Sequence, residues 1–327
     1  MNGMILAAGR GTRLYPLTAF RAKPAVPFLN RPLIQYSLDL LFQAGLTEIV
    51  INSHYLPRSI SEALEFDDYA TTYEISFSHE KKILGTGGAI SNVRDFLGGD
   101  TFVVCNGKIY FEQNLEPIIH LHQEQDNLVT LVLVPHSGKD SYASVWVDGQ
   151  NNITGFRSEC AGKPFVFTGV HVLNPKILDL IPEGPSETVN DLYPRLIQEG
   201  YRVQAFVSDA YWCECSTPKN YLFKSLEVLK KRNLTNLVSR DVRFAGKNLI
   251  ASPSTHIDPN CFLESSILWD NATVGHGSTL NQVIVTQGVN LQPHTHLKNA
   301  IVTPCSDDIH HESISARTVG DYRIFPL

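Results

Sequence analysis

A short glycine-containing segment near the start of the chain has the residue types needed to hold a polyphosphate. It runs Gly9-Arg10-Gly11-Thr12-Arg13, and Lys23 follows ten residues after Arg13. Glycines let backbone N–H groups approach phosphate oxygens closely, and arginine and lysine side chains neutralise their charge. A glycine turn that merely ends a strand is the alternative. The segment lacks the ending of a P-loop, so we predict a phosphate site of another kind.

A second glycine run, Leu84-Gly85-Thr86-Gly87-Gly88-Ala89, has the composition of a helix start. Glycines at a helix N-terminus let the backbone lie against a bound ligand, whose negative charge the helix dipole favours. Such a run taken alone is more often a helix start without a ligand.

Strands and helices alternate along the part of the chain that carries these segments. Apolar runs predict strands at 4–8, 47–52, 73–78 and 101–105, and helical spacing predicts helices at 32–45, 57–64 and from about 86. This order predicts an α/β fold with a Rossmann-like, mostly parallel sheet and helices on both faces. In such sheets ligands bind beyond the carboxyl ends of the strands, which places residues 9–18, 85–88 and 106–108 along one edge.

The sequence pattern changes beyond residue 241, where single apolar residues recur every six residues. Seven positions follow this spacing, with a one-residue slip before the fifth: Phe262, Leu268, Val274, Leu280, Val285, Leu291 and Leu297. Six-residue repeats build parallel β-helices, and chance spacing is the alternative. Because 327 residues also exceed one compact domain, we predict a binding domain at 1–238 and a short left-handed parallel β-helix at 239–327.

Composition restricts the partners. The chain has 33 acidic and 27 basic residues, for a net charge of −6, so its surface as a whole should repel nucleic acid and anionic lipid. It has no apolar run of membrane length and no basic leader, which predicts a cytoplasmic protein. Its six cysteines are scattered, and only Cys213 and Cys215 stand close together, at a spacing unusual for structural zinc. We predict reduced, packed thiols.

The opening segment resembles that of the nucleotide-sugar pyrophosphorylase family. The family pattern, Leu-Ala-Ala/Gly-Gly-x-Gly-Thr-Arg-Leu-x-Pro-Leu-Thr followed by Pro-Lys-Pro, matches residues 6–18 and Lys23-Pro24, with Ala22 in place of the first proline. The resemblance implies that Arg13 and Lys23 hold a nucleoside triphosphate. It also implies that the following residues lie beside the nucleotide: Leu6, Ala7, Ala8, Gly9, Gly11, Thr12, Gly85, Thr86 and Gly87.

Later segments resemble the sugar side of the same family. The strand 167–172 is similar to the one that contacts the sugar, so the resemblance implies that Gly169 leaves room for the ring. Gly162-Lys163-Pro164 is similar to a Glu-Lys-Pro element, which implies that Lys163 meets the sugar phosphate, although Gly162 replaces the glutamate. A solvated lysine is the alternative. Asn106 is expected on the same side.

The resemblance covers residues 1–229 and implies a sugar-1-phosphate nucleotidylyltransferase. Such an enzyme condenses a nucleoside triphosphate with a sugar 1-phosphate and releases pyrophosphate. The opening segment and the β-helical tail look closest to mannose-1-phosphate guanylyltransferases, while guanine, uracil and thymine all remain open as bases. The β-helix is a candidate surface for homo-oligomer formation.

One position departs from the family pattern in a way that concerns the metal. In family members the strand that corresponds to 101–105 is followed by Gly-Asp, and the aspartate binds Mg²⁺, whereas this chain has Lys108 there. The second expected ligand is Glu214, in place of an aspartate. An ammonium group repels Mg²⁺, so the resemblance implies an Mg²⁺ cofactor that this departure calls into question. There are two alternatives: Lys108 itself contacts the α-phosphate, or its side chain points into solvent.

Two other functions compete with the enzyme assignment. The Lys108 substitution favours a catalytically impaired regulatory paralogue that binds nucleotide sugars and assembles through its β-helix. The hexapeptide repeats alone would fit an acyltransferase with a histidine base, and the repeats contain His276, His294 and His296. We expect these histidines on solvent-facing turns instead.

Overall fold

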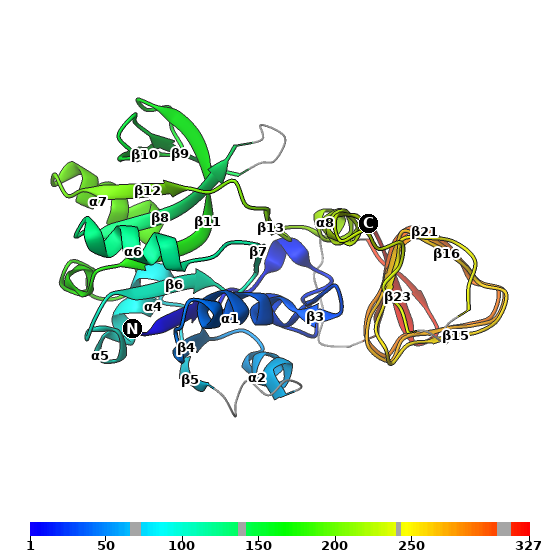
Figure 1. Cartoon of the computed structure of the whole chain (residues 1–327). Coiled ribbons are helices and arrows are strands. Elements are labelled where there is room, and N and C mark those ends of the chain that lie inside the picture. The colour runs from blue at the N-terminus through cyan, green and yellow to red at the C-terminus, as the bar shows by residue number, and fades with distance from the viewer. Residues whose placement is uncertain (66–72, 137–141, 240–242, 306–314) are drawn as a thin grey trace. The chain divides into compact units, whose positions relative to one another are not determined.

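The chain forms two compact units in a computed structural model that describes residues 1–65, 73–136, 142–239, 243–305 and 315–327 (Figure 1). The first unit comprises residues 1–10 and 33–214, and the second comprises residues 11–32 and 215–327. These units differ from the predicted division at residue 238, because the second unit includes both a segment near the N-terminus and residues 215–238. No helix in the described part of the chain is long and apolar enough to cross a bilayer.

The first unit is built on a nine-stranded sheet of order β10-β9-β11-β6-β1-β4-β5, in which β8 also pairs with β11 and β12 pairs with β8. The nine strands are β1 (Gly3–Leu6), β4 (Glu48–Ser53), β5 (Glu74–His79), β6 (Phe102–Asn106), β8 (Val129–Pro135), β9 (Ser144–Val147), β10 (Ile153–Phe156), β11 (Lys163–Leu173) and β12 (Val203–Val207). A separate two-stranded sheet pairs β7 (Ile109–Phe111) with β13 (Trp212–Glu214).

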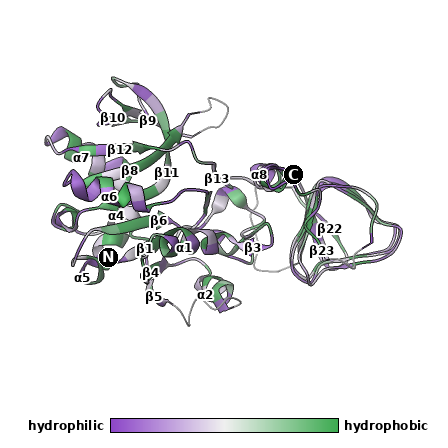
Figure 2. Cartoon of the chain, in the orientation of Figure 1, coloured by the Kyte–Doolittle hydropathy of each residue, from purple (hydrophilic) through white to green (hydrophobic). Residues whose placement is uncertain are grey.

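The strands predicted near the N-terminus are confirmed, and the sheet around them is parallel. Strand β1 pairs in parallel with β4 and β6, and β4 pairs in parallel with β5. The other half of the sheet is mixed, because β11 runs antiparallel to β6, β8 and β9. The expected mostly parallel sheet is therefore parallel mainly in the half that contains β1. In Figure 2 apolar colouring follows the central strands.

Helices cover both faces of the sheet, as predicted. The first unit contains α1 (Leu33–Gln43), α2 (Pro57–Glu65), α4 (Gly85–Asn92), α5 (Arg94–Leu97), α6 (Glu116–Glu124), α7 (Tyr193–Gln198) and the short turns η3 (Pro175–Asp179) and η4 (Thr188–Leu192). A Cβ on Gly3 would lie 3.2 Å from Leu41 of α1, whereas Met4, the next residue of β1, packs in one cluster with Ala89 and Ile90 of α4. Successive residues of a strand point to opposite faces, so α1 and α4 lie on opposite sides.

The second unit contains stacked parallel strands in its C-terminal part. Strands β14, β17, β19 and β21 pair in parallel, and each register joins residues 17 apart, such as Leu249 with Ser266 and Thr279 with His296. A second face repeats this offset through β15, β18 and β20. The chain therefore forms coils of 17 residues. The strands are β14 (Leu249–Ala251), β15 (His256–Ile257), β16 (Phe262–Glu264), β17 (Ser266–Leu268), β18 (Thr273–Val274), β19 (Thr279–Val285), β20 (Asn290–Leu291), β21 (His296–Pro304), β22 (Arg317–Val319) and β23 (Tyr322–Pro326).

The corners of the coils explain the slip in the predicted repeat. Ser265, Gln282 and Asn299, each 17 residues apart, have positive φ angles of 50°, 55° and 50°. Each coil is shortened by one residue at this corner, so two six-residue steps alternate with a step of five. The five-residue step at the Ser265 corner leads back from Leu268 to Leu263. Leu263 is fully buried, whereas Phe262 is 42% exposed. The prediction for Phe262 was wrong.

The segment 11–32 packs in the second unit together with α8 (Pro218–Lys231). It contains η1 (Thr12–Leu14), η2 (Lys23–Ala25) and the two-residue strands β2 (Pro27–Phe28) and β3 (Arg31–Pro32). The hydroxyl of Tyr221, on α8, donates to the carbonyl of Pro27 at 2.6 Å, and Asn30 donates to the carbonyl of Ala251 at 2.8 Å. These hydrogen bonds account for the membership of residues 11–32 in this unit.

Candidate functional site

In the first unit, a buried chain of hydrogen bonds joins the loop after β1 to the second glycine run. The backbone N–H of Ala7 donates to Asn52 Oδ1 at 2.6 Å, and Asn52 Nδ2 donates to Glu80 Oε1 at 2.7 Å. The other oxygen of Glu80 accepts from the N–H of Leu84 at 2.9 Å. Strand β1 ends at Leu6, earlier than predicted, because Ala7 bonds a side chain instead of a neighbouring strand.

Asn52 and Glu80 were not among the residues predicted from the sequence. Both side chains are buried. Asn52 lies in β4 and Glu80 directly follows β5, so both occupy the carboxyl ends of parallel strands. Because ligands bind beyond the carboxyl ends of such strands, the position of these two polar residues could have identified them from the sequence. Through these bonds Ala7, in the loop after β1, and Leu84, at the start of the second glycine run, are joined at this edge of the sheet.

The second glycine run is packed against the segment 184–187. The N–H groups of Gly87 and Gly88 both donate to the carbonyl of Ser186, at 2.8 and 3.2 Å, and Thr86 Oγ1 donates to Glu187 at 2.7 Å. A Cβ on Gly87 would lie 2.6 Å from Ser186 Oγ. Close packing thus accounts for the glycines, and the N–H groups of Thr86, Gly87 and Gly88 in the first turn of α4 already have protein acceptors. Contact of Gly85, Thr86 and Gly87 with a nucleoside stays a prediction.

The structure brings Gly169 and Asn106 together. Gly169 has φ +89°, and a Cβ there would lie 2.9 Å from the Cβ of Asn106. The space beside Gly169 is therefore filled by the Asn106 side chain, whereas we expected it to be left for a sugar ring. The strand β11 is irregular here, since its register with β8 shifts between Phe167 and His171. Any sugar contact at this point would involve Asn106.

Lys163 begins β11 and its side chain is exposed. The preceding Gly162 has φ +115°, and a Cβ there would collide with the backbone of Val147. The glutamate of the family pattern could not adopt this conformation without strain, which explains the departure at 162. The exposure of Lys163 leaves its ammonium group accessible to an anion.

Lys108 and Glu214 form an ion pair, with Nζ and Oε1 3.2 Å apart. Strands β7 and β13 bring them together, because Glu214 pairs with Ile109, the residue after Lys108. We predicted Glu214 as a metal ligand, but its carboxylate faces an ammonium group, which would repel a divalent cation. The described residues also contain no group of three or more His, Cys, Asp or Glu side chains placed to hold a metal. This pair does not fit Mg²⁺.

In the second unit, Gly11 supports Lys23. Gly11 has φ +65°, and a Cβ there would lie 3.0 Å from the Cβ of Lys23 and 3.1 Å from Thr18 Cγ2. Thr18 Oγ1 donates to the carbonyl of Gly11 at 3.2 Å, which closes the turn. Lys23 is only 5% exposed, whereas the side chain of Arg13 is exposed. The structure thus brings Gly11, Thr18 and Lys23 together in one turn.

The remaining candidate groups are the cysteines and the histidines of the coils. The six cysteines are free, and burial raises the pKa of Cys105 to about 12, so this thiol stays protonated. His276, His294 and His296 are exposed on the coils, as we expected. The rings of His276 and His294 lie 5.7 Å apart in an edge-on contact.

Comparisons with known proteins show which family the chain resembles. The nucleotidyl transferase family model matches residues 2–231. The mannose-1-phosphate guanyltransferase of Pichia angusta is 30% identical over 80% of this chain and 74% of its own length. The probable mannose-1-phosphate guanylyltransferase 2 of Oryza sativa subsp. japonica is 28% identical over 92% and 86%. The crystal structure of HddC from Yersinia pseudotuberculosis superposes with a TM-score of 0.60 at 25% identity, covering 69% of this chain and 99% of HddC.

The turn at Gly11 generates a prediction about stability. Gly11→Ala should destabilise the protein by about 1–2 kcal/mol, because a side chain is disfavoured at a left-handed φ and would press against Lys23. The measurement is the free energy of unfolding in urea. Gly9→Ala is the matched control, since its Cβ would meet no described atom within 4 Å. Equal stability of the two variants would contradict the role of Gly11.

Proposed function

Because the chain belongs to the nucleotidyl transferase family, we propose that it joins a nucleoside triphosphate to a sugar 1-phosphate. The product is a nucleoside diphosphate sugar, and pyrophosphate is released. The observation that carries this proposal is the turn in which Gly11 and Thr18 hold Lys23, two positions after Arg21 and ten after the exposed Arg13. It lies within the matched residues and carries two cationic side chains on one short segment, of which Arg13 is exposed and Lys23 is buried.

We assign the triphosphate to Arg13 and Lys23. An oxygen of the sugar 1-phosphate attacks the α-phosphorus, and the bond from that phosphorus to the oxygen of the departing pyrophosphate breaks. The electron pair of this bond leaves with the pyrophosphate, so negative charge builds up on the β-phosphate. Cations held in place before the reaction stabilise that charge without having to reorganise. The buried stem of Lys23 and the closed turn at Gly11 provide such fixed placement.

The sugar phosphate is assigned to Lys163, Asn106 and Gly169. The exposed ammonium group of Lys163 can pair with the phosphate. The side chain of Asn106 fills the space beside Gly169 and supplies an amide that can bond sugar hydroxyl groups. The nucleoside is assigned to the backbone of Leu6, Ala7, Ala8, Gly9, Gly11 and Thr12 and to Gly85, Thr86 and Gly87.

We propose guanine as the base and mannose as the sugar. The support is that the two curated relatives described above are named mannose-1-phosphate guanyl- or guanylyltransferases. The fold by itself does not set specificity, so the choice has to be read from a panel of substrates.

For the metal, the resemblance implies Mg²⁺, but the pair at 108 and 214 does not fit it. We propose instead that the ammonium group of Lys108 supplies positive charge to the phosphates at this position. Glu214 then serves to hold Lys108 and is not a metal ligand.

We also propose that the stacked coils form a left-handed parallel β-helix that mediates homo-oligomer formation. The support for a regular β-helix is the 17-residue offset and the recurring left-handed corners at Ser265, Gln282 and Asn299. A cytoplasmic location fits six free cysteines, which persist in a reducing compartment.

Pyrophosphate release tests the proposed reaction. The purified chain should release pyrophosphate with GTP and mannose 1-phosphate, and more slowly or not at all with UTP or dTTP and with glucose 1-phosphate. Arg13→Ala should lower kcat/KM roughly a hundredfold, because it removes a charge that stabilises the transition state. Absence of release for every pair, with nucleotide binding retained, would favour the regulatory paralogue that the Lys108–Glu214 pair also suits.

The role of Lys108 predicts how metal dependence responds to substitution. Lys108→Asp should restore a pair of carboxylates with Glu214 and raise the ratio of turnover with Mg²⁺ to turnover without it, roughly tenfold or more. Lys108→Met is the control, because it removes the charge without adding a ligand and should lower turnover under both conditions. An unchanged ratio in Lys108→Asp would remove the argument that this position replaces a metal site.

A further inference from the structure

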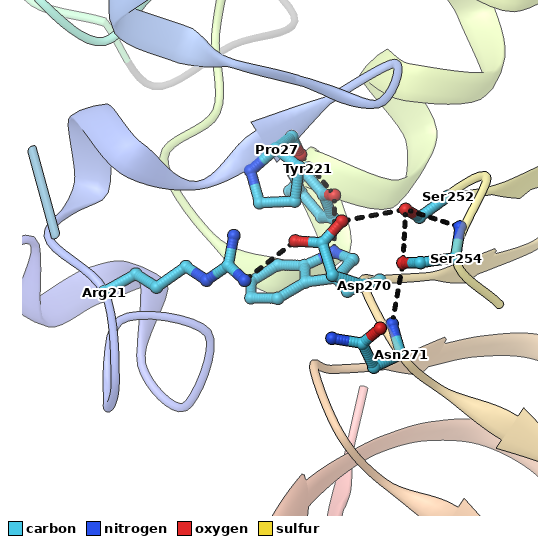
Figure 3. Close-up of polar contacts among 8 residues, drawn as sticks. Arg21, Pro27, Tyr221, Ser252, Ser254, Asp270 and Asn271 are labelled. Atoms are coloured by element: carbon cyan, nitrogen blue, oxygen red, sulfur yellow. Dashed lines mark hydrogen bonds and ion pairs between the residues drawn. The ribbon is translucent and has the colours of Figure 1, made fainter. Parts of the chain in front are cut away.

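A corner of the second unit's coils holds the segment that carries Lys23. Asp270, on the turn between β17 and β18, accepts from Arg21 Nη2 at 2.8 Å through one carboxylate oxygen. Its other oxygen accepts from Ser252 Oγ at 2.8 Å, and Ser254 continues the chain of bonds to the backbone of Asn271 (Figure 3). Both oxygens of the carboxylate therefore have partners, one of them on the N-terminal segment.

Trp269, the neighbour of Asp270, contacts the same segment directly at Arg21 and is linked to it at Pro27 through Tyr221. The Arg21 guanidinium carbon lies 5.6 Å from the centre of the Trp269 ring, at a distance suited to a cation–π contact. The indole N–H donates to the hydroxyl of Tyr221 at 3.0 Å, and this hydroxyl donates to the carbonyl of Pro27 at 2.6 Å. Burial raises the pKa of Tyr221, which keeps its hydroxyl protonated as a donor. Arg21 and Pro27 flank Lys23 in the sequence and are thus both held.

The repeat itself shows that Trp269 and Asp270 are not required by the coils. Ser252, Trp269 and Thr286 make the same backbone hydrogen bond in successive coils, each to the residue 16 positions further on. The position of Trp269 is therefore taken by a small hydroxyl residue in the neighbouring coils. The position of Asp270 corresponds to Pro253 and Gln287. Trp269 and Asp270 are the exceptions, and they are the residues that contact Arg21.

We propose that Trp269 and Asp270 are positioning residues for the nucleoside triphosphate. They hold Arg21, and through it they fix the segment 11–32 in the arrangement that places Arg13 and Lys23. This inference rests on the proposed function, because it takes those two cations to bind the triphosphate. It gives the C-terminal coils an indirect part in substrate binding, in addition to any role in assembly.

The size of the expected effect follows from the exposure of the pair. The side chains of Arg21 and Asp270 are 24% and 43% exposed, so solvent screens their attraction in part. The contact of Arg21 with Trp269 adds to it. Loss of the aspartate should therefore raise the Kd for the triphosphate roughly three- to tenfold, which is a modest but measurable change.

The experiment compares Asp270→Ala, Asp270→Asn and Arg21→Gln with the wild-type chain. In Asp270→Ala and Arg21→Gln, the Kd for GTP should rise, while the KM for the sugar 1-phosphate stays the same. Asp270→Asn keeps one acceptor oxygen, which can accept from Arg21 or from Ser252 but not at both carboxylate positions, and should recover part of the affinity. Amide hydrogen exchange within residues 11–32 should be faster than in the wild-type chain in Asp270→Ala and Arg21→Gln, and intermediate in Asp270→Asn. Asp179→Ala is the matched control, because Asp179 accepts from Arg94 Nη2 at a similar 2.9 Å within the first unit.

The two readouts separate the possible failures. A wild-type chain that binds no nucleoside triphosphate would overturn the proposed function and this inference with it. Wild-type binding with an unchanged Kd in Asp270→Ala and Arg21→Gln would overturn the inference alone. An equal rise in both the Kd for GTP and the KM for the sugar phosphate would also overturn it, since that pattern indicates a general loss of structure.

Discussion

The other features depend on one constraint: the short segment that carries Arg13 and Lys23 must be held in one conformation by its own turn at Gly11. Gly11 adopts a left-handed conformation, and the stem of Lys23 packs where a side chain on Gly11 would lie. A polyphosphate can be held only if its counter-charges are kept in place at little entropic cost. The coils hold the same segment through Asp270, which accepts from Arg21, and through Trp269, which is linked to Pro27 by Tyr221.

Much of the fold could be predicted because periodicity reflects burial directly. Strands buried on both faces are continuous apolar runs, and the 17-residue coils appear as aliphatic positions at near-hexad spacing. The direction of β11 was missed because an antiparallel strand with two covered faces has the same apolar pattern as a parallel one. The inward-facing residue at 263 was missed because a single left-handed corner, here Ser265, shifts the spacing by one.

The candidate site was only partly predictable because a glycine in a sequence does not show which group approaches it. Gly87 is packed against Ser186, Gly169 against Asn106, and Gly162 against Val147, and none of these partners is near in sequence. The pairing of Lys108 with Glu214 likewise depends on the register of β7 and β13. Residue types thus identified the region, whereas the tertiary contacts determined which side chains are available to a ligand.

A crystal structure of the chain with a non-hydrolysable nucleoside triphosphate tests the central claim most directly. Arg13 and Lys23 should both lie within hydrogen-bonding distance of phosphate oxygens, with the base beside the backbone of residues 6–9. This placement would be contradicted by a bound nucleotide whose phosphates meet neither cation, or by both side chains turned away from the nucleotide.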